Sequence, residues 1–314
     1  MEFNDAILVT GGTGMVGARL VAKLKQSGFE NVMAPTRSEL NLSDEESVDA
    51  WFEMSRPRFA FLIAAKVGGI AANIEDPTGF LTENLRIAVN QITACHRFGV
   101  EKLLFLGSTC IYPRECPQPM HESHLLTGPL EPTNEGYALA KISGMRLAQF
   151  HHAQFGMNCV LPMPCNIYGT NDHFDLSRCH VLSALVKRFC DAVETGVDEL
   201  VLWGSGQARR EFIHVDDAVD GMLHLFQASA SGEIVNLGSG KDVSILELAE
   251  IISTEAGFKG QILWDTSRPD GMLRKCSDVS RLNELGFQAS ISLREGIRRT
   301  IDEYRALSSS PCGS

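Results

Sequence analysis

The sequence lacks several features that define whole classes of protein. Its nine cysteines form no CxxC pair, so the pattern indicates neither a disulfide framework nor a zinc or other metal site. The longest apolar run, Phe59 to Ala65, stops at Lys66, far short of the roughly 20 residues that a membrane-spanning helix needs. Basic residues are also scarce, with 28 lysines and arginines against 39 acidic residues and a net charge of −11. This charge argues against nucleic-acid or membrane-surface binding.

The N-terminus has no basic segment followed by an apolar stretch, the pattern of a signal peptide. Instead, Glu2 and Asp5 precede an apolar run that begins at Ala6. We therefore expect a cytoplasmic protein. With 314 residues and a hydrophobic content of 44%, the chain is long enough to bury a large core and to divide into two lobes.

Short β-rich segments alternate with helical segments through the first half of the chain. A helix is expected at 16–27, and strands are expected at 6–10, 31–34, 59–64, 102–107 and 159–163. This alternation predicts an α/β fold, a Rossmann-type doubly wound parallel sheet with helices on both faces. Five of the twelve prolines lie between 113 and 132, which predicts a long loop over the strand ends.

After residue 165 the alternation loosens, and the remaining pattern predicts a smaller α/β lobe. Helices are expected at 181–195, 246–256 and 293–307, with a strand at 199–203. Residues 1–165 would then form the cofactor-binding domain, which a segment around 212–240 is expected to rejoin, and 166–314 mainly the substrate-binding lobe. The small-residue tail, 308–314, is expected to fray.

A glycine-rich turn joins the first predicted strand to the first predicted helix. Gly11, Gly14 and Gly17 lack a Cβ, which permits a tight turn, a close approach of a pyrophosphate and close helix packing. The helix N-terminus adds amide donors and positive potential. In this context the turn predicts a dinucleotide site, to which we also assign Met15, Val16 and Ala65.

The residues after the second predicted strand bear on the choice between NAD and NADP. An NAD site usually has an acidic residue there for the ribose 2′-hydroxyl, whereas this chain has Thr36-Arg37-Ser38. Arg37 can pair with a 2′-phosphate, so we predict NADP(H); the alternative is a solvated surface arginine. Asp44 is assigned to the adenine end of the site, although a helix N-cap explains it equally well.

Tyr137 and Lys141 stand four residues apart in a predicted helix and so share one face. Lys141 could then bind the nicotinamide ribose and lower the pKa of Tyr137, which ordinarily titrates near pH ~10. Ser108 follows the strand predicted at 102–107 and would hydrogen-bond the same substrate oxygen. These three residues are candidate catalytic groups for reduction of a ketone.

These motifs resemble the extended branch of the short-chain dehydrogenase/reductase superfamily. Further segments, at 64–70, 104–113, 130–135 and 203–212, resemble the GDP-L-fucose synthase family, and the resemblance runs from residue 6 to about residue 283. It implies conversion of GDP-4-keto-6-deoxy-D-mannose to GDP-L-fucose, by C3/C5 epimerisation and NADPH-dependent reduction of the C4 ketone. It also implies a homodimer formed through helices at 76–98 and 137–155.

The resemblance implies roles for further residues. Cys110 would be the base and His180 the acid in the epimerisation, with His180 also near the cofactor. The implied substrate-binding residues are Asn166, Arg188, Trp203, Arg210 and Lys275. Without the resemblance, Cys110 and His180 would more often be packing or surface residues.

The segment His214 to Asp217 also matches the family, but we interpret it structurally. Asp216 or Asp217 is expected to cap a helix that begins near Ala218, and His214 to order the turn.

Three alternative functions stay open from the sequence. A GDP-L-colitose synthase would use a 3-deoxy substrate and epimerise only C5. An NAD-retaining 4-epimerase or dehydratase is disfavoured by Arg37 and by the Cys110–His180 pair. A dinucleotide sensor without activity is also compatible with the fold, although the candidate catalytic set is intact.

Overall fold

A six-stranded parallel sheet forms the larger lobe of the computed structural model, which describes residues 1–176, 179–267 and 272–309. The strands, in spatial order, are β2 (Val32–Met33), β1 (Ile7–Thr10), β3 (Phe59–Leu62), β4 (Lys102–Phe105), β5 (Asn158–Pro164) and β9 (Ile234–Leu237). Every residue of β1 and β3 is buried, as expected for central strands covered on both faces. The predicted α/β, Rossmann-type sheet is confirmed.

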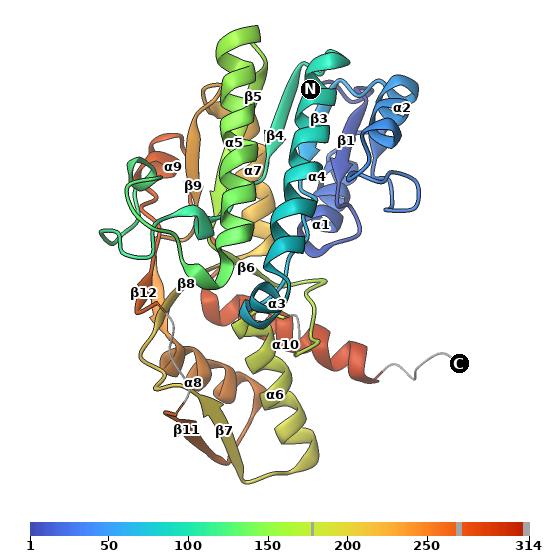
Figure 1. Ribbon diagram of the computed structural model, residues 1–314. Helices are drawn as coiled ribbons and strands as arrows, with labels where there is room; N and C mark the ends of the chain where they lie inside the picture. The colour runs from blue at the N-terminus through green and yellow to red at the C-terminus, as the bar shows by residue number, and fades with distance from the viewer. Residues whose placement is uncertain (177–178, 268–271, 310–314) are drawn as a thin grey trace.

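Helices cover both faces of this sheet (Figure 1). On one face pack α2 (Glu45–Ser55), α4 (Pro77–Arg97) and α5 (Glu135–Phe155), whose apolar side chains share a core with the strands. On the other face pack α1 (Met15–Gln26) and α7 (Val215–Ala228), with a second core. The strands thus present buried side chains in both directions, and only their carboxyl ends are left to build a site.

Short elements line those carboxyl ends. After β3 comes α3 (Ile70–Glu75), and after β4 come three 3-10 turns, η1 (Thr109–Ile111), η2 (Glu122–His124) and η3 (Pro132–Asn134). The loop predicted from the prolines at 113–132 is therefore interrupted by η2 and ends at η3.

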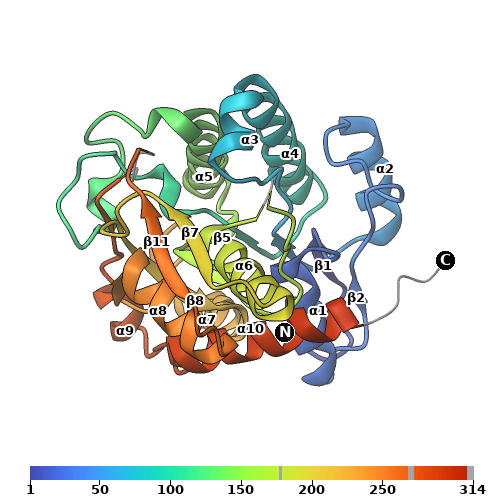
Figure 2. The ribbon, with the colours of Figure 1, turned by 90° about the horizontal axis from the view of Figure 1, so that it is seen from below.

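The smaller lobe lies at the carboxyl edge of the sheet and has its own core (Figures 1 and 2). Its helices are α6 (Val181–Thr195), α8 (Ile245–Ala256) and α10 (Leu293–Ser309). Between α8 and α10 in the chain, α9 (Ser280–Glu284) returns to the larger lobe and packs against β9. The strands of the smaller lobe are β6 (Asn166–Tyr168), β7 (Glu199–Trp203), β8 (Arg209–His214), β10 (Asp242–Ser244), β11 (Gln261–Asp265) and β12 (Arg274–Lys275). One small sheet joins β10, β8 and β12, with β6 also on β8, and a second joins β11 to β7.

Most predicted elements are present, with small shifts at their ends. The helix predicted at 181–195 and the strand predicted at 199–203 have these bounds in the structure. The strands predicted at 59–64 and 102–107 end two residues earlier, because the chain turns there into the loops of the site. Residues 308 and 309 form the end of α10, and the rest of the tail lies outside the described residues. Fraying of the tail stays a prediction.

The predicted cap of the helix near Ala218 is wrong. The helix, α7, begins at Val215, and the side chain of His214 caps it by accepting a hydrogen bond from the Asp216 amide at 3.2 Å. Asp217 is buried and accepts hydrogen bonds from the amides of Ser290 and Ile291 at 3.0 and 2.8 Å. The expectation that His214 orders this turn is confirmed.

Among the described residues, no helix combines the length and the apolar character needed to cross a lipid bilayer.

Candidate active site

The glycine-rich turn between β1 and α1 is closely packed at Gly11 and Gly17. Gly11 has a φ of +72°, which favours glycine, and a Cβ added at Gly17 would lie 2.1 Å from the Gly11 carbonyl oxygen. Gly14 is the N-cap of α1, and no side chain caps the first amides of the helix. Met15 and Val16 form the half-buried first turn. This is a cradle that a pyrophosphate fits.

A cavity of about 1060 Å³ extends from this turn along the ends of β1 and β3. It contains three of the residues assigned to the dinucleotide, Gly11, Arg37 and Ala65. Asp44 is not among its lining residues, and its carboxylate caps α2 by accepting from the Ser47 amide at 3.1 Å. The contact of Asp44 with a cofactor stays a prediction.

Charged side chains gather at one end of this cavity. The Arg37 side chain is 83% exposed, and its guanidinium lies 3.1 Å from a Glu83 oxygen of α4. Lys66 lies 2.7 Å from Asp76 and 3.5 Å from Glu83. The hydrogen bond to Asp76 raises the pKa of Lys66, and the same bond lowers the pKa of Asp76. Because its side chain is so exposed, Arg37 is free to reorient toward the 2′-phosphate of a bound dinucleotide.

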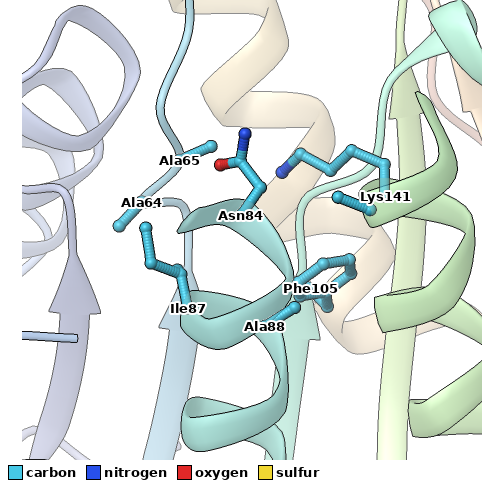
Figure 3. A pocket seen from close by; sticks show the side chains of 8 residues that line it. Ala64, Ala65, Asn84, Ile87, Ala88, Phe105 and Lys141 are labelled. Atoms are coloured by element: carbon cyan, nitrogen blue, oxygen red, sulfur yellow. The ribbon is translucent and has the colours of Figure 1, made fainter. Parts of the chain in front are cut away.

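Lys141 lies deep at the junction of α5 with β4. It is 4% exposed, and its ammonium donates to the Leu106 carbonyl at 2.7 Å and lies 5.0 Å from the Phe105 ring centroid. Figure 3 shows it beside a small cavity, opposite Asn84 of α4 and above Phe105. Burial lowers the pKa of Lys141 to about 8.

Tyr137 lies one turn earlier on α5, with its ring centroid 5.8 Å from the Lys141 ammonium. Desolvation raises the pKa of Tyr137, and the neighbouring Cys110 raises it further, while a hydrogen bond with Ser108 opposes this change. The expectation that Lys141 lowers the Tyr137 pKa is therefore wrong for this structure, in which the ammonium is bound to the Leu106 carbonyl. The predicted proximity of Tyr137, Lys141 and Ser108 is present.

Cys110 stands in η1, directly after β4. The Ser108 hydroxyl caps η1 by accepting from the Cys110 amide at 3.2 Å. Lys275 of β12 reaches across from the smaller lobe and places its ammonium 3.6 Å from the Cys110 sulfur. Desolvation raises the pKa of this thiol, but the Lys275 charge and hydrogen bonds with Ser108, Lys275 and Asn134 outweigh it and lower the pKa. The sheet side of the site thus holds the Tyr137 phenol, the Lys141 ammonium and the Cys110 thiol, whose pKa is lowered.

The other candidate substrate residues fall into two groups. Asn166 donates to the Glu211 carbonyl of β8 at 2.8 Å, and Arg210 is the register partner of Lys275, so these three lie around the β8–β12 pair. Arg188 donates to the Val201 carbonyl of β7 at 2.5 Å, and Trp203, 70% exposed, ends the same strand.

His180 is an exposed residue at the N-cap of α6, without a side-chain cap. Its charge is among the causes that lower the pKa of Asp172, although desolvation, the largest cause, raises that pKa overall. Residues 177 and 178, just before it, lie outside the described residues.

A comparison against known families covers the strand–turn–helix unit and the segment that contains Ser108, Tyr137 and Lys141. The model of the NAD dependent epimerase/dehydratase family matches residues 7–238. The chain belongs to this family. A putative GDP-L-fucose synthase 2 from Arabidopsis thaliana is 47% identical over 304 residues, which cover 97% of this chain and 93% of that protein. A GDP-L-colitose synthase from Yersinia pseudotuberculosis is 38% identical over 302 residues, which cover 95% of this chain and 97% of that protein.

A solved structure agrees with these relatives. A GDP-L-fucose synthetase from Naegleria fowleri bound to NADP superposes with a TM-score of 0.89 at 27% identity, covering 99% of this chain and 97% of that chain. The comparisons therefore support a nicotinamide-dependent epimerase/reductase, and the site is interpreted as that of such an enzyme.

Sequence reasoning did not single out two residues, Asn84 and Asn134, that help to build the site. Asn84, 4% exposed, accepts from the Lys66 amide at 2.7 Å and donates to the Lys66 carbonyl at 3.0 Å. It thereby fixes the loop after β3 against α4. The signal available in the sequence was a polar residue, Asn84, on the same helix face as the apolar residues of α4. Asn134 of η3 hydrogen-bonds Cys110. It lies in the family-like segment 130–135, but the sequence did not indicate its contact with Cys110.

The cysteines and potential metal ligands add no further site. The eight cysteines within the described ranges are free thiols. No group of three or more potential metal ligands occurs in residues 1–176, 179–267 and 272–309.

Proposed function

We propose that this protein converts GDP-4-keto-6-deoxy-D-mannose to GDP-L-fucose, by epimerisation at C3 and C5 followed by reduction of the C4 ketone with NADPH. The proposal rests on one observation: residues suited to reduce a ketone and a thiol suited to remove a proton lie side by side at the carboxyl ends of the sheet. Ser108, Tyr137 and Lys141 suit the reduction of a ketone, and the acidified thiol of Cys110 lies two residues from Ser108. The higher identity to the fucose-type than to the colitose-type relative favours the 3-hydroxy substrate.

A 4-keto sugar has acidic hydrogens at C3 and C5, because the carbanion left behind is delocalised onto the ketone oxygen. In the proposed mechanism the Cys110 thiolate removes such a proton, and His180 returns one to the opposite face. Ser108 and Tyr137 donate hydrogen bonds to the enolate oxygen that develops. Tyr137 later gives its proton to the C4 alkoxide.

A dinucleotide would fit at the first turn, where glycine at position 17 lets α1 pack directly on the Gly11 backbone. The residues proposed to hold it are Gly11, Gly14, Met15, Val16, Gly17, Arg37, Asp44, Ala65, Lys141 and His180. When bound, NADPH supplies the hydride that reduces C4. We assign the cofactor to residues 1–165 with α7 and β9, and the GDP-sugar mainly to the remaining lobe, where Asn166, Arg188, Trp203, Arg210 and Lys275 would contact it.

The central test follows solvent deuterium into the sugar. Wild-type enzyme with NADPH and GDP-4-keto-6-deoxy-D-mannose should consume NADPH and yield an L-galacto product with deuterium at C3 and C5. Cys110→Ser should lose that incorporation, whereas Cys116→Ser, a matched change at a half-buried neighbouring cysteine, should retain it. Incorporation at the wild-type rate in Cys110→Ser would overturn the role of Cys110. Turnover of only the 3-deoxy substrate would overturn the fucose assignment.

The preference for NADP(H) rests on Arg37. Arg37→Ala should raise the KM for NADPH and leave that for NADH nearly unchanged, because only NADPH carries the 2′-phosphate. Arg86→Ala is the control, since Arg86 is an exposed residue of α4 that does not line the cavity. Equal changes in KM for both cofactors would contradict this role.

We also propose a homodimer formed through α4 and α5. These helices carry exposed apolar side chains, Val89 at 43%, Leu139 at 39%, Phe150 at 66% and Phe155 at 51% exposure, and such a surface suits a partner. Sedimentation should give twice the chain mass for the wild type and a monomer for Phe150→Glu. A monomeric wild type would refute the dimer.

A further inference from the structure

The two-residue strand β12 is fixed more firmly than its length suggests. It pairs in parallel with β8, with Lys275 opposite Arg210. The Cys276 amide donates to the Gln118 side chain at 2.9 Å, and the Met120 amide donates to the Cys276 carbonyl at 2.7 Å. The backbone that carries Lys275 is therefore tied to the loop that follows η1.

A buried carboxylate holds the other side of the same segment. Glu211 is 1% exposed, and it accepts hydrogen bonds from the amides of Ser277 and Gly240, each at 2.7 Å. Since β12 is bound on both sides, Lys275 can reach only a limited region. Its ammonium lies in that region 3.6 Å from the Cys110 sulfur.

Several groups face the Cys110 thiol from the elements packed around it. Ser108 belongs to the turn before η1, Asn134 to η3, Tyr137 to α5 and Lys275 to β12. Tyr137 is neutral when its pKa is raised, so the full positive charge in this set comes from Lys275. A cation this close favours the thiolate over the thiol.

We propose that Lys275 is a positioning residue that keeps Cys110 in its thiolate form in the free enzyme, ready to accept a proton from the sugar. The proposal rests on the proposed function, in which Cys110 is the base. As the proton moves, the C–H bond breaks, an S–H bond forms, and the electron pair passes to the ketone oxygen. Lys275 keeps its own protons throughout.

This role differs from the substrate contact that the family resemblance implies for Lys275. A lysine that only binds the diphosphate changes the KM for the sugar nucleotide and leaves the thiol of the free enzyme as it was. A lysine that stabilises the thiolate changes the reactivity of Cys110 before any substrate is added. The two roles are separated by a measurement on the enzyme without substrate.

The experiment is alkylation of the full-length enzyme by iodoacetamide over a range of pH, with the labelled peptides quantified by mass spectrometry. At a fixed pH below the thiol pKa, Lys275→Met should slow the alkylation of Cys110 by about tenfold or more, because alkylation requires the thiolate. Lys275→Arg should retain most of the rate. Cys179, a half-buried thiol of the smaller lobe, is the reference peptide, and the exposed Lys241→Met is the matched control.

The outcomes separate this proposal from the proposed function. An unchanged pH profile of Cys110 alkylation in Lys275→Met, with or without a higher KM, would overturn the role of Lys275. A shifted profile that Lys275→Arg restores would support it, even if the wild type exchanged no protons at C3 and C5; that second result would refute the proposed function alone. In wild-type enzyme that does exchange them, Lys275→Met should shift the pH dependence of exchange in the same direction as that of alkylation.

Discussion

The two walls of the site are built by different physical means. The sheet wall carries Ser108, Cys110, Tyr137 and Lys141, and apolar cores on both faces of the sheet hold its elements in place. In the lobe wall, which carries Lys275, Glu211 anchors the strand through hydrogen bonds to two backbone amides. Many weak apolar contacts together hold the sheet wall in place, whereas a few hydrogen bonds set the geometry of the lobe wall.

The largest effect should come from the sheet wall. Tyr137→Phe keeps the ring beside Lys141 but removes the proton, so NADPH oxidation should fall by about 10²–10⁴-fold. Tyr304→Phe is the matched control, because the Tyr304 hydroxyl bonds Lys187 and Asp191 in the smaller lobe. If Tyr137→Phe oxidised NADPH at a rate within a few fold of the wild type, Tyr137 would not be the acid of the reduction.

Removing apolar packing should mainly cost stability. Phe105 is 2% exposed under Lys141, and Phe105→Ala should lower the free energy of unfolding by about 3–5 kcal/mol. Chemical denaturation would measure this, with Phe3→Ala as the control, because Phe3 is 62% exposed and lies outside α4 and α5. Equal losses in both variants would contradict the importance of the core here.

In the lobe wall, a smaller loss of stability should be accompanied by a change at the site. Glu211→Leu leaves the amides of Gly240 and Ser277 without their acceptor, which should cost about 2 kcal/mol. Because β12 is then released, alkylation of Cys110 should slow in Glu211→Leu and less in Glu211→Gln, which keeps one acceptor oxygen. A Glu211→Leu enzyme with wild-type Cys110 reactivity would show that the two walls are not built differently.

The smallest effect concerns the buried Lys141. Burial lowers its pKa from 10.5 to about 8, so between these values the unfolded chain binds more protons than the folded chain. Stability should therefore rise with pH across this window, by about 1 kcal/mol between pH ~8 and pH ~9, relative to Lys141→Met. Urea unfolding at the two pH values measures the difference, and parallel pH dependences in the two proteins would contradict it.

The sequence predicts the sheet wall better than the lobe wall, for a physical reason. Strand and helix periodicity and the turn at Gly11 to Gly17 are local patterns, and they place the cofactor cradle and the Tyr137–Lys141 face. The contact of Lys275 with Cys110 spans 165 residues and depends on a two-residue strand that has no pattern of its own. Only a family resemblance pointed to Lys275, and it implied a different role.

The errors of the sequence-based prediction also have physical causes. Histidine is outside the usual set of N-cap residues, so the acidic residues after His214 were assigned its role in α7. The sequence predicted a lowered pKa for Tyr137, whereas the pKa is raised, because desolvation is the largest cause of the shift. Desolvation depends on how the fold buries the side chain, and the sequence alone does not show that burial.

The path of the chain through β9 limits how this protein can be recombined. The strand that completes the large sheet, β9, pairs with β5, but the chain reaches it only after building β6, α6, β7 and β8 of the other lobe. A hybrid made by one crossover near residue 165 would therefore bring in a foreign edge strand together with the new lobe. Exchange of substrate specificity between relatives requires several junctions, or partners whose fifth and ninth strands are already compatible.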